Sequence, residues 1–145
     1  MASSNKTTLN LNLWEASDKP SREDFVSDNI IIDEKLSQAE QALTPQWIHY
    51  EKNSENCSEG GIVAYKMGHL LMLCGALTVS KAGHNLELAQ LHNVQLLTDA
   101  AWTVAGGYGL PGADIYMNNK GSGIVINAYV VTPGVYKFNL TVAVA

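Results

Sequence analysis

The spacing of apolar residues between Phe25 and Leu43 constrains this chain more than any other feature of its sequence. Six residues recur alternately four and three positions apart, which is the a/d pattern of a coiled coil with Asn29 at an a position. They are Phe25, Asn29, Ile32, Leu36, Ala39 and Leu43. Upstream, Ser21 and Asp24 have the spacing of a capping box, which predicts a helix that begins near residue 22. Because three heptads are marginal alone in water, residues 22–43 are predicted to form a stalk that self-associates.

The residues before this helix predict an extended arm over positions 1–21. Residues 2–8 are polar without helical periodicity, and Leu9, Leu11 and Leu13 then alternate with asparagines. Such alternation suits a segment that lies on another surface. Trp14 has two interpretations. It anchors the arm to another protein, which the neighbouring apolar stripe favours, or it packs on the β domain of its own chain.

From Ile62 onward the sequence has the short β-branched segments and regular Gly, Pro and Asn punctuation of an all-β domain. We predict an antiparallel, jelly-roll-like β-sandwich head over residues 47–145, with an exposed hairpin loop at 118–123. The expected strands are 62–66, 69–79, 86–91, 94–97, 102–104, 115–118, 124–131 and 135–144. The fold class is therefore mainly β, with an amino-terminal arm and a short coiled-coil helix.

One predicted strand, residues 69–77, is apolar on both faces. Leu71, Leu73 and Leu77 lie on one side, while Leu70, Met72, Cys74 and Ala76 lie on the other. Antiparallel sheets usually keep one face in solvent. A strand without a polar face needs a second cover, and a neighbouring subunit is the simplest one.

Composition excludes several classes of function. The 145 residues carry a formal net charge of −5 with nine Lys and Arg in no cluster, so nucleic acid is not an expected partner. No apolar run approaches the roughly 20 residues of a membrane span, and no signal peptide is recognised. Cys57 and Cys74 are expected to be free thiols, with a disulfide as the alternative.

Neither a metal site nor a catalytic site is predicted. The four histidines have no short pair spacing that places two ligands on one face, and they are His49, His69, His84 and His92. Cys57, His49 and Asp99 are the ingredients of a nucleophilic triad, but no nucleophile elbow frames them. Glu51, Glu55 and Glu59 fall in a stretch expected to be a solvated loop. No enzyme activity and no cofactor are expected.

A saccharide site is the remaining candidate. Residues 106–112 are rich in glycine without the lysine of a phosphate loop, and aromatic residues surround them beside a carboxylate. This combination suits ring stacking and hydroxyl hydrogen bonds to a sugar. The candidate residues are Trp102, Tyr108, Asp114 and Tyr116. For Trp102 and for Tyr116, a place in the core is the stronger expectation than a place in the saccharide site.

Residues 3–25 closely resemble the amino terminus of tail, baseplate and receptor-binding proteins of phages and prophages of Gram-positive bacteria. The similarity includes the "NLNLWEASDKPSREDF" segment and continues through Asp28, Asn29, Ile32 and Asp33. Segments at 62–70, 109–112 and 135–142 look like the small β tip domains of that family. The resemblance implies a homotrimeric virion tail component, assembled in the host cytoplasm, whose arm binds tail or baseplate proteins and whose head contacts host cell-wall saccharide. The alternative function is a free-standing lectin-like module whose arm only mediates oligomerisation.

Overall fold

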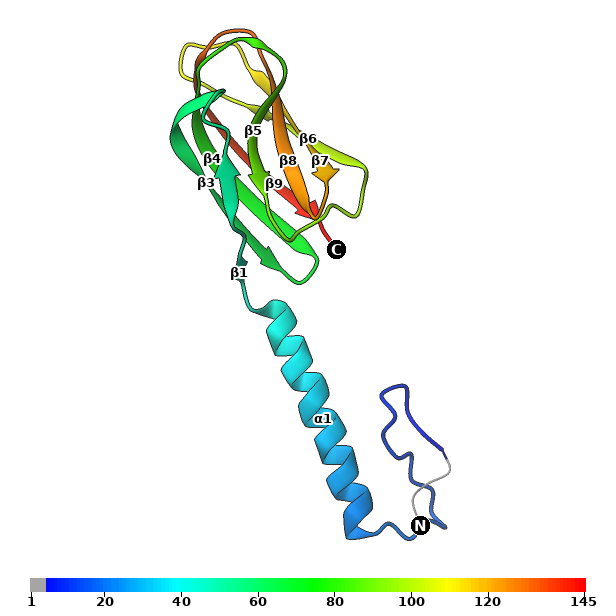
Figure 1. The fold of residues 1–145 in the computed structure, drawn as a ribbon. Coiled ribbons are helices and arrows are strands. Elements are labelled where there is room, and N and C mark those ends of the chain that lie inside the picture. The colour runs from blue at the N-terminus through cyan, green and yellow to red at the C-terminus, as the bar shows by residue number, and fades with distance from the viewer. Residues whose placement is uncertain (1–4) are drawn as a thin grey trace. The chain divides into compact units, whose positions relative to one another are not determined.

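The computed structural model describes residues 5–145 and divides the chain into two compact units, Met1–Thr44 and Pro45–Ala145. The first unit contains α1 (Arg22–Leu43), and the second contains only strands (Figure 1). The strands are β1 (Gln46–Trp47), β2 (Tyr50–Lys52), β3 (Cys57–Met67), β4 (Leu70–Val79), β5 (Gly83–Leu91), β6 (Ala100–Ala105), β7 (Ala113–Lys120), β8 (Gly123–Val130) and β9 (Gly134–Ala143). Across the described part of the chain, no helix has the length and apolar character needed to cross a membrane.

The predicted helix is confirmed from its first residue to its last. Ser21 caps it: the Ser21 hydroxyl accepts a hydrogen bond from the Asp24 backbone, and the Asp24 carboxylate accepts one from the Ser21 backbone at 2.8 Å. At the other end, the Thr44 backbone donates to the Glu40 carbonyl. No residue of α1 is buried in the single chain. Capping therefore defines where the helix begins and ends, and its side chains stay at least partly exposed in the single chain.

The leader differs from the extended arm predicted for residues 1–21, of which residues 1–4 lie outside the described part. Residues 5–13 turn back on themselves: the Thr7 backbone donates to Leu11, and the Leu13 backbone donates to Asn5. The turn needs a left-handed residue, and Asn10 supplies it with φ 67°. The prediction of an extended arm is wrong there, because the alternating Leu and Asn residues pair with the polar segment before them.

Two hydrogen bonds join this turn to α1. The backbone and side-chain amides of Asn12 both donate to one carboxylate oxygen of Asp28, at 3.0 and 2.8 Å. The Trp14 ring packs against Phe25 with ring centroids 5.7 Å apart. Trp14 thus contacts the helix of its own unit, a third possibility beside the two interpretations above.

The second unit consists of two antiparallel sheets, which confirms the mainly β fold (Figure 1). One sheet has the order β1-β3-β4-β9, and the other has the order β2-β5-β8-β7-β6. Their inner faces contribute to one hydrophobic core, in which Leu71 and Leu77 of β4 and Tyr136 of β9 belong to the first sheet. Ile115 of β7 and Ile126 of β8 come from the second.

Some predicted boundaries are wrong. Residues 94–97 form no strand, since Leu96 makes one isolated bridge to Val144 while Val94 and Leu96 are buried from a loop. The stretch from Glu51 to Glu59 is only partly a loop, because β2 and the start of β3 occupy its ends. The hairpin loop at 118–123 is shorter than predicted, as Lys120 already pairs with Gly123.

Candidate functional site

The outer face of the five-stranded sheet gathers aromatic and polar side chains. Along β7, Ala113, Ile115 and Met117 point into the core. Asp114 and Tyr116 alternate with them and therefore point outward. The register pairs Tyr116 with Trp102 on one side and with Asn127 on the other, and pairs Asp114 with Tyr129. We call the outward set the aromatic face: His84, Trp102, Asp114, Tyr116, Asn127 and Tyr129.

The expectation that Trp102 and Tyr116 fill the core is wrong for both residues. Trp102 is 72% exposed. Tyr116 is half-buried, and its hydroxyl donates to the side-chain oxygen of Asn85. The His84 and Tyr129 rings are stacked with centroids 3.9 Å apart. The Tyr116, His84 and Tyr129 rings are therefore held by neighbours, while the Trp102 ring projects into solvent.

Of the four predicted ligand residues, three come together and one does not. Trp102, Asp114 and Tyr116 share the aromatic face through strand pairing. Tyr108 lies in the β6–β7 loop, is fully exposed, and belongs to no strand. The sequence analysis missed His84, Asn127 and Tyr129. Alternation along β8, where Ile126, Ala128 and Val130 are buried, was the signal that marks Asn127 and Tyr129 as outward.

Chemically, this face combines stacking surfaces with hydrogen-bonding groups. The exposed indole of Trp102 offers an apolar plane, while the Asp114 carboxylate accepts hydroxyl hydrogen bonds. Asn127 offers both a donor and acceptors. Such a surface suits a flat, hydroxyl-rich ligand.

The predicted oligomerisation residues are all exposed or contact only the leader. Ile32 is 40% exposed, Leu36 65% and Leu43 67%. Phe25, the first residue of the seam, meets Trp14 and remains half-exposed. Asn29 and Ala39 are exposed on the same helix. These six residues are therefore open to solvent in the single chain, apart from the contact of Phe25 with Trp14.

The outer face of the four-stranded sheet is a second exposed apolar surface. Register places Trp47 beside Tyr65, Tyr65 beside Met72, and Val63 beside Cys74. The Trp47 and Tyr65 rings lie 6.0 Å apart, and a shallow hollow of about 360 Å³ runs from Tyr65 past Cys74. We call these five residues the apolar face. It contains the outward side of the strand whose two faces are both apolar in sequence.

Both cysteines are free thiols. Cys57 lies in the core, and burial raises the pKa of its thiol, against a smaller opposing effect of the Lys52 charge. Cys74 is exposed on the apolar face. Their environments predict different reactivities, because the thiolate is the reactive form.

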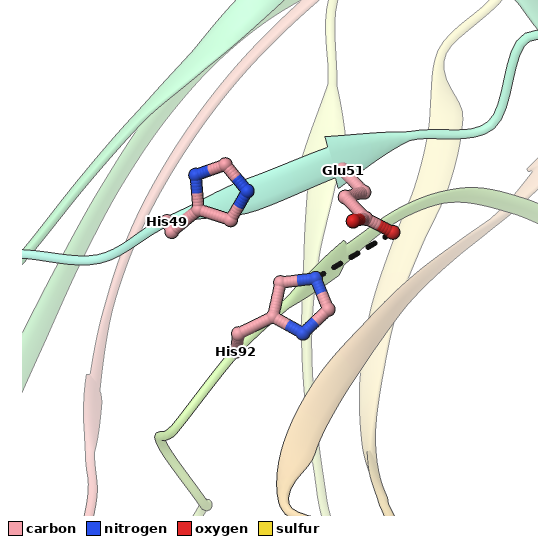
Figure 2. Close-up of side chains that lie close together, drawn as sticks. All are labelled: His49, Glu51 and His92. Carbon is pink, nitrogen blue, oxygen red and sulfur yellow. Dashed lines mark ion pairs between the residues drawn. The ribbon is translucent and has the colours of Figure 1, made fainter.

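A third cluster, at the β2 edge of the five-stranded sheet, was not predicted. His49, Glu51 and His92 lie together, with one potential metal-binding atom from each within 4.8 Å of the others (Figure 2). His49 and His92 are separated by a long stretch of sequence, and the pairing of β2 with β5 brings them together. Since no short spacing links the two histidines, only knowledge of this strand pairing could have found the cluster.

Comparisons with protein family models, with curated proteins and with solved structures found no match to this chain.

Proposed function

We propose that this chain is a self-associating structural and adhesive protein, a homotrimer with a coiled-coil stalk and a β-sandwich head. The observation that carries the proposal is the helix α1, which spans 22 residues without one buried side chain. An isolated helix of this length is marginal in water, and helices in proteins owe most of their stability to packing.

The seam of α1 supports association through this helix. Ile32, Leu36 and Leu43 expose their aliphatic side chains along a line that repeats every 3.5 residues. In a trimer of parallel helices these side chains are removed from water, which stabilises the assembly by about 25 cal/mol for each Å² of apolar area buried. Asn29 in the same line fixes the register of the helices.

Attachment to a phage or prophage tail is the second part of the proposal. It rests on the resemblance of residues 3–25 to the leader of tail, baseplate and receptor-binding proteins. The order of leader, stalk and head along the chain supports it. The leader, including its turn at residues 5–13, is the segment we propose to bind other tail proteins.

Adhesion is the third part, and the aromatic face supports it. Trp102 projects from an edge strand with most of its indole in water, beside Tyr116 and near Asp114. An exposed aromatic plane can stack on a sugar ring, and a neighbouring carboxylate can accept hydrogen bonds from the sugar hydroxyls. The proposed ligand is a saccharide of the host cell wall.

Binding of the full chain to polysaccharide from Gram-positive cell walls tests adhesion, with two tryptophan variants. Trp102→Ala is expected to abolish binding, because it removes the stacking plane. Trp47→Ala controls for the loss of an exposed tryptophan, since Trp47 is 76% exposed but lies on the other sheet. Its oligomeric mass is measured alongside, because Trp47 belongs to the apolar face. Loss of binding in Trp47→Ala alone would place the site on the apolar face. Equal binding by Trp102→Ala and the wild type would refute the aromatic face as the site.

The second candidate function is a free-standing lectin-like module, which the aromatic face favours independently of any tail. The two functions differ in whether the leader has a protein partner. Genes for tail assembly beside the gene for this chain, and co-purification of tail proteins only when residues 1–20 are present, support the tail component. Saccharide binding without either result supports the free module.

A further inference from the structure

The cluster of His49, Glu51 and His92 has the composition of a transition-metal site. β2 and β5 are antiparallel, with Tyr50 opposite Leu91 and Glu51 opposite Gln90. The ladder extends one step further, because the His92 backbone donates to the His49 carbonyl at 3.0 Å. His49, Glu51 and His92 therefore project from the same side of the sheet, and Figure 2 shows their side chains gathered on one side of β2.

One nitrogen of this cluster makes no hydrogen bond, although it lies within ion-pair distance of Glu51, as the dashed line in Figure 2 marks. The Nε2 atom of His92 is inaccessible to solvent and makes no hydrogen bond, and it is the only side-chain atom of that kind among residues 5–145. Its nearest charged neighbour is the Glu51 carboxylate at 3.7 Å, beyond hydrogen-bonding distance. A buried polar atom that makes no hydrogen bond is unfavourable in the folded state. A ligand between His92 and Glu51 would satisfy this nitrogen.

The third ligand is already close. The His49 and His92 rings are stacked with centroids 5.5 Å apart. Tetrahedral zinc with bonds of about 2.0–2.1 Å places its ligand atoms about 3.3 Å from one another. The present separations of up to 4.8 Å therefore need a small contraction. His49 and Glu51 are exposed, so rotation of their side chains supplies it while the paired backbone stays fixed.

We propose that His49, Glu51 and His92 bind one zinc ion per chain, with two imidazole nitrogens and one carboxylate oxygen as ligands. This donor set is typical of zinc, whereas magnesium and calcium prefer oxygen ligands alone. Three protein ligands leave the fourth position to water. The ion links β2, an edge strand of three residues, to β5 at the end of their pairing. This inference does not depend on the proposed function.

Calorimetric titration of the metal-free full chain with zinc tests the site. We expect one zinc bound per chain, a higher melting temperature with zinc, and no such rise with magnesium. Loss of an outer-shell partner alone weakens metal binding by about 10- to 100-fold, so His49→Ala, His92→Ala and Glu51→Gln are each expected to weaken it at least as much. His69→Ala is the matched control, since His69 is exposed, lies between β3 and β4, and is outside the cluster.

A second readout separates loss of ligand from loss of fold. Cobalt at the same site is expected to give the visible absorption of a tetrahedral ion, and Glu51→Gln, an exposed and nearly isosteric change, is expected to remove it without lowering the melting temperature of the metal-free protein. The proposal is overturned if the wild type binds no zinc. It is equally overturned if Glu51→Gln and His69→Ala change zinc affinity to the same extent, because binding would then be nonspecific.

Discussion

Ser21 and Asp24 define the start of the stalk through two reciprocal hydrogen bonds. The hydrogen bond from the Ser21 backbone lowers the pKa of the Asp24 carboxyl. A carboxyl with a lowered pKa in the folded state stabilises it fully above the pKa of the unfolded chain, and this contribution is lost as pH falls through the folded-state pKa. The cap is therefore expected to persist at neutral pH and to fail only in acid, below 3.8, the ordinary pKa of an aspartate carboxyl.

Removal of the Ser21 hydroxyl tests the role of this residue as the helix cap. Ser21→Ala is expected to destabilise the helix by about 1 kcal/mol, because the Asp24 backbone amide loses the hydroxyl that accepts its hydrogen bond. Ser27→Ala is the control, since the same substitution inside the helix removes no cap and replaces serine by a better helix former. Thermal unfolding followed by circular dichroism measures both. An equal effect of the two substitutions would contradict the capping role of Ser21.

Among the helices and strands, those with a cap or a periodic apolar pattern in their own residues were predicted from the sequence. The helix was predictable because its cap and its seam both lie within residues 21–43. Strands β4 and β9 were predictable from alternation and apolar content. β1 and β2 were missed because two or three residues carry no periodicity. The stretch 94–97 was predicted as a strand because buried loop residues have the same composition as a strand.

The candidate sites depend on pairing between distant segments, so the sequence predicted them only in part. Trp102, Asp114 and Tyr116 were found because neighbouring strands β6 and β7 carry them. The addition of His84 and Tyr129 requires β5 and β8 to share the same sheet. The His49–His92 pair likewise depends on β2 joining β5. Long-range register of this kind has no local signature.

Asn29 gives a test at the element scale. If position 29 lies in the seam of a coiled coil, Asn29→Ile is expected to raise the melting temperature and to broaden the distribution of oligomers, because a buried polar a residue lowers stability and fixes register. Gln38→Ile, off the seam on the same helix, is expected to do neither. A lower melting temperature for Asn29→Ile, measured alongside sedimentation profiles, would show that residue 29 is outside the seam.

At the scale of the whole molecule, two apolar surfaces remain open in the single chain: the seam of α1 and the apolar face of the head. The proposed association of three copies would cover the first. Because the outward side of β4 is apolar at Met72 and Cys74, we propose that a neighbouring subunit also covers the second.

Alkylation of the two thiols tests whether the apolar face is covered. Cys74 is expected to react more slowly in the assembled wild type than in an Ile32→Ser, Leu36→Ser variant that cannot assemble. Cys57 is expected to stay unmodified in both, because it is buried and its raised pKa keeps the thiol protonated. Mass spectrometry of labelled peptides gives both rates. The same Cys74 rate in both proteins would mean that the head surface stays open.

The mass of the assembled chain, measured by sedimentation equilibrium, directly tests whether three copies associate through α1. At micromolar concentration we expect three times the chain mass of 15.7 kDa. The double variant Ile32→Ser, Leu36→Ser is expected to shift the mass toward the monomer, as each buried aliphatic truncation destabilises by roughly 2–5 kcal/mol. Ile30→Ser is the matched control, because Ile30 is 54% exposed on the same helix but off the seam, and it should remain trimeric. A wild-type monomer, or equal dissociation of the seam and control variants, would contradict association through α1.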